Sequence, residues 1–357
     1  MRRIFCSIRR RIRSLQFLSS DVLVKADGAG WILDHFAKEI AANLSPQIRI
    51  RVCHSKLPPL KKRLIHFVDF ECWRTNWPGR YDPSNKIIGL WWHGGLDSID
   101  PHVKKHAANV NTNSRSMTTV HVTCSVSQQK VREMGVAEDK IEFLPMGVNL
   151  HLFHPPHSEH ERRAVRQRLG IPEERFVVGL FQKDGVGWGE GNEPKLIKGP
   201  DIFLQVMAQL AESYPLFALI PGPARGYLIK GLQRLGIPYR NDGHVPHSQI
   251  NSYYHATDLY IIPGREEGGP AAVLESLAAG TPLISHRVGM APDVIRDGQN
   301  GFLIEVEDVD EMVRKASRLM ESQALRQQFR EEGLRTIKTY DWSVLAPQYG
   351  VLYASLL

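Results

Sequence analysis

Short apolar runs rich in branched and aromatic residues alternate with helical patterns along most of this sequence, and this alternation constrains its fold most strongly. In the first half, strands are expected at Asp21–Lys25, Ile48–Val52, Leu64–Phe67, Ile87–Trp92, Thr119–Cys124 and Lys140–Leu144. Helical spacing lies between several of them, as in Trp31–Leu44 and Ser127–Met134. Strands that alternate with helices predict an α/β fold with parallel sheets covered on both faces.

A second series of the same kind follows a polar, proline-containing stretch. Its strands are expected at Phe176–Phe181, Phe217–Ile220, Leu259–Ile262 and Pro282–Ser285, and its helices at Pro200–Glu212, Tyr227–Leu235 and Ala271–Ala279. The 357 residues, 42% hydrophobic and 23% charged, are enough for two ordinary globular domains. We therefore predict an N-terminal segment at 1–20, a first domain at 21–155, a linker at 156–172, a second domain at 173–337 and a C-terminal helix at 338–357.

Residues 1–20 carry six arginines and no acidic residue, which is nearly all of the formal net charge of +7. Ile4, Ile8, Ile12 and Leu15 fall on one side of a helix, with most of the arginines opposite. A basic amphipathic helix of this kind suits an anionic membrane surface, and a solvated tail or a helix packed on the protein itself is the alternative. Because the rest of the chain is nearly neutral, we expect no nucleic-acid partner.

The segment Arg265–Pro282 carries the most functional information. It follows an expected strand, turns at Gly268 and Gly269, and opens a helix. The glycines let the backbone approach a ligand, and the free amides at a helix start form a seat for phosphate. Glu267 precedes the turn, and Glu275 lies about one and a half turns inside the helix. This spacing suits a nucleotide sugar, with its diphosphate on the helix start and the carboxylates on hydroxyls of the ribose and the sugar.

The same residues resemble the signature E-G-x-G-x-x-x-x-E-x-x-A-x-G-x-P of retaining glycosyltransferases with the GT-B fold, glycosyltransferase family 4. The matching positions are Glu267, Gly268, Glu275, Ala278, Gly280 and Pro282, and Pro270 replaces the second glycine. Because proline has no amide hydrogen, we expect the phosphate contact to shift to Ala271 or Ala272. The resemblance implies two doubly wound, Rossmann-like domains facing a central cleft, with the last helix crossing back onto the first domain.

Other segments extend this resemblance. Lys198-Gly199-Pro200-Asp201 is similar to the K-G-x-D motif of the family, whose lysine implies a positive charge on the donor phosphates. The family has an arginine at the end of the preceding strand, where this chain has Gln182, so Lys183 or Arg225 would supply that charge. The backbone at Val245 resembles the strand edge that contacts the base.

On the acceptor side, His93 ends an apolar strand and resembles the histidine that faces the cleft in the family. It would bind the transferring sugar or orient the acceptor, and the alternative is a purely structural histidine. Gly28 and Gly30 allow close approach of a ligand or form a plain strand-to-helix turn. The glycine-rich stretch Asp184–Asn192 is interpreted as a flexible insertion, with a phosphate-binding loop as the alternative.

The sequence predicts no metal site and no required cofactor. His151, His154, His157 and His160 recur at every third residue, but Pro155 and Pro156 exclude a regular helix there. The four cysteines lie far apart without a C-x-x-C pair, which fits a reducing cytoplasm.

Together these features predict a metal-independent, retaining hexosyltransferase that moves a sugar from a UDP- or GDP-sugar to a hydroxyl of a glycan or a lipid-linked acceptor. Glu267, His93 and Lys198 are the expected catalytic residues. The donor is expected to be bound by Lys183, Arg225, Val245, Gly268, Gly269, Ala271, Ala272 and Glu275. A nucleotide-sugar hydrolase or epimerase, and a catalytically silent sugar-nucleotide-binding module, remain as alternatives. The expected location is the cytoplasm, at the inner face of a membrane if residues 1–20 bind it.

Overall fold

The computed structural model describes residues 19–44, 48–75, 77 and 80–357. The chain divides into two compact units. Unit 1 combines the N-terminal part, up to Gly147, with Trp342–Leu357, and unit 2 is Val148–Asp341. The basic segment predicted at the N-terminus falls almost entirely within residues 1–18, outside the described residues.

Unit 1 is built on a parallel sheet with the strand order β2-β1-β3-β4-β5-β6. Its strands are β1 (Val22–Lys25), β2 (Ile50–Cys53), β3 (Leu64–Phe67), β4 (Lys86–Trp91), β5 (Thr119–Val122) and β6 (Ile141–Phe143). All residues of β1, β3 and β5 are buried. Helices cover both faces of such a sheet, which is why its strands appear in the sequence as continuous apolar runs.

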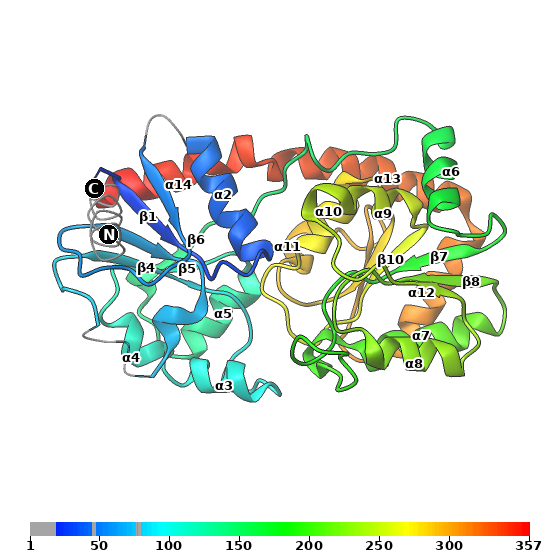
Figure 1. Cartoon of the computed structure of the whole chain (residues 1–357), viewed down its shortest axis with the longest axis horizontal. Helices are drawn as coiled ribbons and strands as arrows, with labels where there is room; N and C mark the ends of the chain where they lie inside the picture. Colours follow the sequence, from blue (N-terminus) through cyan, green and yellow to red (C-terminus); the bar gives the residue numbers. More distant parts are fainter. Residues whose placement is uncertain (1–18, 45–47, 76, 78–79) are drawn as a thin grey trace, which may run out of the picture. The chain divides into compact units, whose positions relative to one another are not determined.

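Helices α2 (Ile32–Leu44) and α14 (Trp342–Leu356) pack together on one face of this sheet. The other face carries α3 (Pro101–Ala107), α4 (Val110–Ser114) and α5 (Ser125–Glu133), as Figure 1 shows. The short 3-10 helices of the unit are η1 (Phe70–Trp73) and η2 (Glu138–Lys140). Thus the last helix of the chain belongs to the first unit, as the fold prediction required.

A buried polar network joins α14 to the sheet of unit 1. His66 on β3 contacts the Tyr353 hydroxyl at 2.8 Å and His121 on β5 at 3.1 Å. His121 in turn contacts the carbonyl oxygen of Leu144 at 2.9 Å, and the Tyr349 hydroxyl donates to the same oxygen at 3.1 Å. Burial lowers the pKa of His121 to about 4 and that of His66 well below its ordinary value, so both rings are neutral.

Unit 2 has a second parallel sheet, ordered β12-β11-β10-β7-β8-β9. Its strands are β7 (Phe176–Gly179), β8 (Leu216–Leu219), β9 (Tyr239–Arg240), β10 (Leu259–Ile262), β11 (Leu283–His286) and β12 (Phe302–Ile304). The chain runs outward from β7 to one edge and from the adjacent β10 to the other. In open α/β sheets, ligands bind beyond the carboxyl ends of strands at such a reversal.

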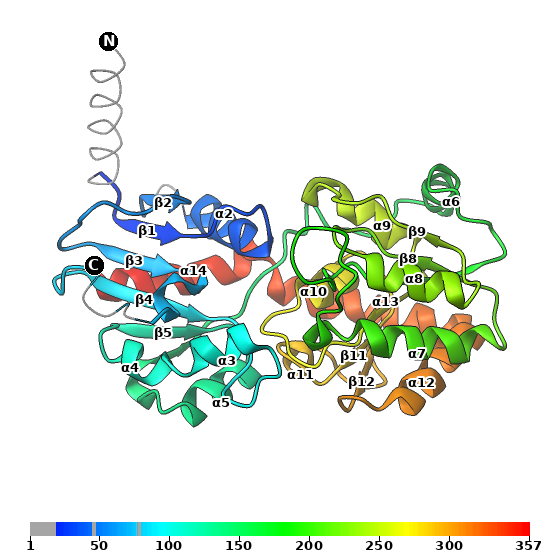
Figure 2. The ribbon, with the colours of Figure 1, turned by 60° about the horizontal axis from the view of Figure 1, so that its bottom comes forward.

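Helices again cover both faces of the unit 2 sheet (Figures 1 and 2). One face carries α7 (Pro200–Ala211), α8 (Gly226–Arg234) and α12 (Val309–Glu321), and the other α9 (Ile250–Ala256), α10 (Ala271–Ala278) and α13 (Gln323–Thr336). Shorter helices are η3 (Leu196–Lys198), η4 (His247–Gln249), α11 (Ala291–Val294) and η5 (Ile337–Tyr340).

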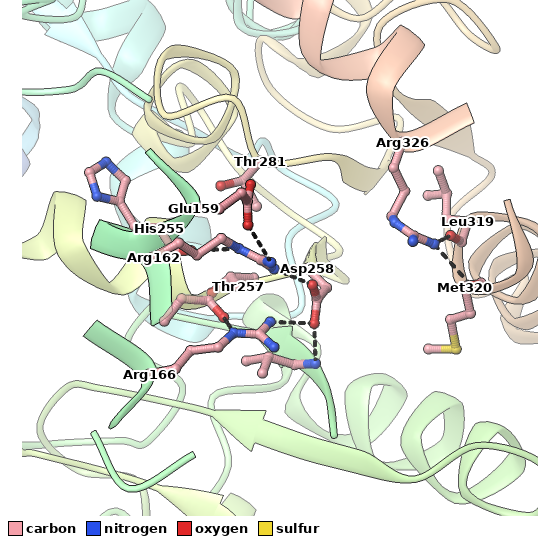
Figure 3. Close-up of polar contacts among 12 residues, drawn as sticks. Glu159, Arg162, Arg166, His255, Thr257, Asp258, Thr281, Leu319, Met320 and Arg326 are labelled. Carbon is pink, nitrogen blue, oxygen red and sulfur yellow. Dashed lines mark hydrogen bonds and ion pairs between the residues drawn. The ribbon is translucent and has the colours of Figure 1, made fainter. Parts of the chain in front are cut away.

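The stretch expected as a linker, 156–172, contains α6 (Glu159–Arg168) and lies within unit 2. The Ser158 hydroxyl caps this helix by accepting from the amide of Glu161. Figure 3 shows Arg162 and Arg166 of α6 converging on the carboxylate of Asp258, just before β10. Their Nε atoms also donate to carbonyl oxygens at the end of α9, at 3.2 and 3.0 Å. The sequence near α6 does not reveal its partner, because Asp258 lies about 90 residues further along the chain. The polar composition of this segment therefore suggested a linker.

The predicted fold class is confirmed, since both units are parallel α/β sheets flanked by helices. The sequence analysis did not predict β9, β12, α3, α4, α6, α9 and α11. Of these, β9 and α6 are too short or too polar to show a repeating spacing of apolar residues. In β9 only two residues pair, and α6 buries just Arg166.

Candidate functional site

Three polar side chains meet at the chain reversal of unit 2. Glu267 follows β10, Gln182 follows the neighbouring β7, and Lys198 ends η3. The Glu267 carboxylate accepts from Lys198 Nζ at 2.6 Å and from Gln182 Nε2 at 2.9 Å. Its side chain is only 4% exposed, whereas that of Lys198 is 16% exposed. The carboxylate is therefore held on two sides, and the ammonium keeps an open face.

The loop that carries Glu267 is fixed by its neighbours. Gly199 has φ +66°, and a Cβ there would lie 1.9 Å from the Pro263 carbonyl oxygen, so only glycine fits. Arg265 forms two bonds to the Asp201 carboxylate, at 2.9 and 2.8 Å, which links this loop to the first turn of α7. Gly289 packs so closely that its Cβ would lie 2.9 Å from the Glu267 carbonyl oxygen. Lys198 and Glu267 therefore meet in a rigid setting.

Helix α10 starts directly after this loop. Its N-cap is Pro270, whose side chain forms no capping hydrogen bond. Ala271 is partly exposed and Ala272 is buried, and Gly268 and Gly269 precede the cap. A helix start without its own capping side chain keeps amide donors and the positive end of the helix dipole for an anion.

Glu275 lies in a separate cluster on the same helix. Its carboxylate accepts from the Tyr254 hydroxyl at 2.8 Å and lies 3.3 Å from His247 Nε2. Burial and the nearby Glu275 charge raise the pKa of Tyr254 well above its ordinary value, so this hydroxyl stays a donor. His247 is two residues beyond Val245, the half-buried residue expected near the base. Sequence reasoning missed both His247 and Tyr254, because nothing in the local pattern links them to Glu275.

Two candidate cations have different environments. Lys183 Nζ lies 4.9 Å from the centre of the Trp188 ring, and burial lowers the pKa of this lysine. Arg225, in contrast, is completely buried in an ion pair with Asp184, and its Nη2 donates to the carbonyl oxygens of Leu180 and Pro221 at 3.2 and 2.7 Å. The structure does not support Arg225 as a phosphate ligand, because its guanidinium has no exposed face.

In unit 1, His93 follows β4 and is buried, with its ring edge-on to Phe70 at 6.0 Å. The turn after β1 differs from the expectation of a ligand-binding loop. The amides of Gly28 and Gly30 both donate to the carboxylate of Asp34, a residue in the first turn of α2 that is 2% exposed. This aspartate occupies the place that a bound anion would take.

The described residues offer neither a metal site nor a membrane-spanning helix. No group of three or more histidine, cysteine, aspartate or glutamate side chains is arranged to hold a metal ion. Within the same described ranges, every helix is too short or too polar to cross a bilayer.

Comparison with known proteins shows which family part of this chain resembles. Residues 194–336 match the family described as glycosyl transferases group 1. The D-inositol 3-phosphate glycosyltransferase 1 of Catenulispora acidiphila is 26% identical over 249 residues, which are 66% of this chain and 56% of that protein. The D-inositol 3-phosphate glycosyltransferase of Streptomyces scabiei is 30% identical over 200 residues, covering 52% of this chain and 42% of the relative. The chain thus spans about half the length of these curated relatives.

Solved structures share the whole fold. The Anabaena protein HepE, in complex with UDP and glucose, superposes with a TM-score of 0.73 at 16% identity, covering 94% of this chain and 100% of HepE. Sucrose-phosphate synthase from Thermosynechococcus elongatus gives a TM-score of 0.71 at 18% identity, covering 94% and 98%. The chain therefore has the GT-B fold, and its residues 194–336 are similar to the glycosyl transferases group 1 family.

Proposed function

We propose that this protein is a retaining glycosyltransferase that moves a hexose from a nucleoside diphosphate sugar to a hydroxyl of a glycan or a lipid-linked acceptor, without a metal ion. One observation carries the proposal. Lys198 and Glu267 form an ion pair of 2.6 Å, directly before a helix whose N-cap residue, Pro270, forms no side-chain capping bond. A cation and free amides that converge at one point suit a diphosphate, and a fixed carboxylate beside them suits sugar hydroxyls.

The donor would lie along α10. Its diphosphate would contact Lys198 and the amides of Gly269, Ala271 and Ala272, with Lys183 as a second charge. The ribose would bind Glu275, whose carboxylate is already oriented by Tyr254 and His247. The base would reach the backbone at Val245. UDP is the first nucleotide to test, because HepE was solved with UDP and glucose.

The proposed chemistry depends on positioning and charge. The bond from the anomeric carbon to the diphosphate breaks, a bond to the acceptor oxygen forms on the same face of the sugar, and the acceptor proton goes to the departing phosphate. Lys198 and the α10 start stabilise the diphosphate charge, and Glu267 holds the sugar. We assign His93 to the acceptor side. We also propose a cytoplasmic location, with residues 1–20 as a contact to anionic membranes.

The test is a thermal-shift titration with UDP, GDP, ADP and CMP in EDTA, on the wild type, Glu275→Ala and, as a control, the exposed Glu212→Ala. A nucleotide at about 100 times its dissociation constant adds roughly 2.7 kcal/mol of stability. We expect one nucleoside diphosphate to stabilise the wild type and Glu212→Ala but not Glu275→Ala. If no nucleotide stabilises the wild type, the donor site is not where we place it.

The matching nucleotide sugar then separates the possible activities. Release of the nucleotide that requires an acceptor, with an α-linked product from an α-linked donor, supports retaining transfer. Release without any acceptor would identify a hydrolase, and binding without release would identify a silent module. Both of these outcomes would contradict the proposal.

A further inference from the structure

A hairpin beside the proposed donor site has no role in the function described so far. Residues 184–195, here called the Trp188 hairpin, join β7 to η3. Gly185 and Pro194 form an antiparallel bridge, and the amide of Val186 donates to the Glu193 carbonyl oxygen at 2.9 Å. The sequence suggested a flexible insertion here, whereas the structure shows a paired element.

The hairpin is anchored at its base by groups that are fully buried. Arg225 pairs with Asp184, and these side chains are 0% and 1% exposed. Gly185 and Gly191 press against Ala224, so that a Cβ at either glycine would lie about 2 Å from the Ala224 carbonyl oxygen. Such a base holds the tip in one position. This is the structural role of Arg225, in place of phosphate binding.

The tip of the hairpin is apolar and exposed. Trp188 is 66% exposed, more than any other aromatic side chain in the described ranges, and Val186 is 46% exposed. Lys183 Nζ lies 4.9 Å from the centre of the indole ring. A large aromatic surface held rigidly in water gains most when a flat apolar face covers it.

Both ends of the hairpin adjoin the donor cluster. Its first residue is two positions after Gln182, which bonds to Glu267, and its last is three positions before Lys198. Ribose and base are assigned to the other end of α10, near Glu275. A ligand that covers Trp188 would therefore lie beside Lys183, the residue next to Gln182 of the donor cluster.

We propose that the Trp188 hairpin binds a pyranose ring of the acceptor glycan, a role that rests on the proposed function. The C–H face of the pyranose stacks on the indole, and the Lys183 ammonium donates to its hydroxyls. A lipid surface fits less well, because the exposed Glu190 and Glu193 would oppose anionic headgroups.

The experiment measures glycan binding directly. Labelled wild type, Trp188→Ala, Trp188→Phe and the control Leu235→Ala are applied, with UDP present, to a printed array of mono- to tetrasaccharides of glucose, galactose, mannose, rhamnose and N-acetylglucosamine. Calorimetry with the strongest saccharide follows. We expect Trp188→Ala to lose affinity by about tenfold or more, Trp188→Phe to retain most of it, and Leu235→Ala to match the wild type.

Three results would overturn this role: no saccharide binds the wild type, binding is equal in Trp188→Ala, or Trp188→Ala instead loses binding to phosphatidylglycerol vesicles. The UDP thermal shift is measured on the same samples. An unchanged shift beside absent glycan binding refutes the hairpin proposal alone, whereas a wild type without a nucleotide shift refutes the proposed function.

Discussion

Two segments of this protein, after β1 and after β10, share the order strand, turn, helix but differ in the position of their acidic residue. Each follows a buried strand, contains glycine and opens a helix. After β1, the Asp34 carboxylate turns back from the helix and accepts the amides of Gly28 and Gly30. After β10, the N-cap residue Pro270 forms no side-chain capping bond, and Glu267 lies before the helix, bound to Lys198. The first turn therefore holds its own anion, whereas we propose that the second binds an external anion through Lys198 and the amides of the helix start.

The difference shows that glycine in such a turn does not by itself mark a ligand site. What matters is where the acid lies. A carboxylate in the first helical turn can reach back to the loop amides, as Asp34 does, and it then closes the site. Glu267 lies before the helix instead, and its carboxylate is engaged by two donors from other elements.

The largest expected effect comes from removing Lys198, the cation beside the turn after β10, here called the open turn. The turn after β1 is called the closed turn, because Asp34 occupies its amides. Lys198→Met keeps the side-chain length, and Gln182 still donates to Glu267, so the loop keeps one of its bonds. We expect sugar transfer to fall by on the order of 10² to 10³, as when one group that stabilises transition-state charge is removed. The assay is nucleotide release from the donor identified by thermal shift, with Lys230→Ala on α8 as the control. Transfer that stays within about twofold of the wild type would remove Lys198 from the mechanism.

Lowering the pH should destabilise unit 1, because its buried histidines are neutral in the folded state. Burial holds His121 neutral with a pKa of about 4, against about 6.5 in an unfolded chain. The unfolded state therefore binds more protons below pH 6.5, so this stability is complete above pH 6.5 and is lost as the pH falls toward 4. For His121 the loss is about 3 kcal/mol.

Hydrogen exchange measured from pH 7 to 4.5 checks this prediction. The amides of α14 should lose protection first, because Tyr349 and Tyr353 dock this helix on the two histidines. In His121→Phe the unfolding free energy should depend less steeply on pH, because unfolding then takes up about one proton fewer. An identical pH dependence in this variant would mean that His121 does not control the docking of α14.

A carboxylate placed on the open turn should imitate the closed one. Ala271 is partly exposed at the first position of α10, so Ala271→Glu puts a negative charge where the diphosphate is proposed to bind. We expect nucleotide affinity to fall by about 30-fold, or roughly 2 kcal/mol, through repulsion and occupation of the amides. Ala271→Gln has the same size without the charge and should change affinity only slightly. Equal losses in both variants, measured by calorimetry, would point to steric blockage instead.

The contrast between the turns also shows what the sequence reveals. Continuous apolar runs such as Leu259–Ile262 predicted the strands, because burial on both faces leaves a local signature. Glu267 and Lys198 were found from motifs that lie next to strand ends. The partners that decide their roles come from distant positions. Asp184 forms an ion pair with Arg225, which follows the neighbouring strand β8, and His247 contacts Glu275, which lies 28 residues further along the chain. Such pairings depend on tertiary geometry, which no local pattern records.

The smallest expected effect comes from the closed turn. Asp34→Asn leaves a single acceptor oxygen for two amides and removes the charge at the start of α2. We expect unit 1 to lose about 1 to 2 kcal/mol of unfolding free energy, measured by urea denaturation, with faster exchange of the Gly28 and Gly30 amides. Asp27→Asn is the control, because its exposed carboxylate accepts only the Ala29 amide.

Nucleotide binding provides the decisive comparison for this variant. If the turn after β1 is closed by its own carboxylate, Asp34→Asn leaves the nucleotide thermal shift at its wild-type value while unit 1 becomes less stable. A lost nucleotide shift with unchanged stability would show instead that the turn of unit 1 binds the ligand. The two turns would then have the opposite roles, because Asp34 would be a ligand-binding group and not a substitute for the ligand.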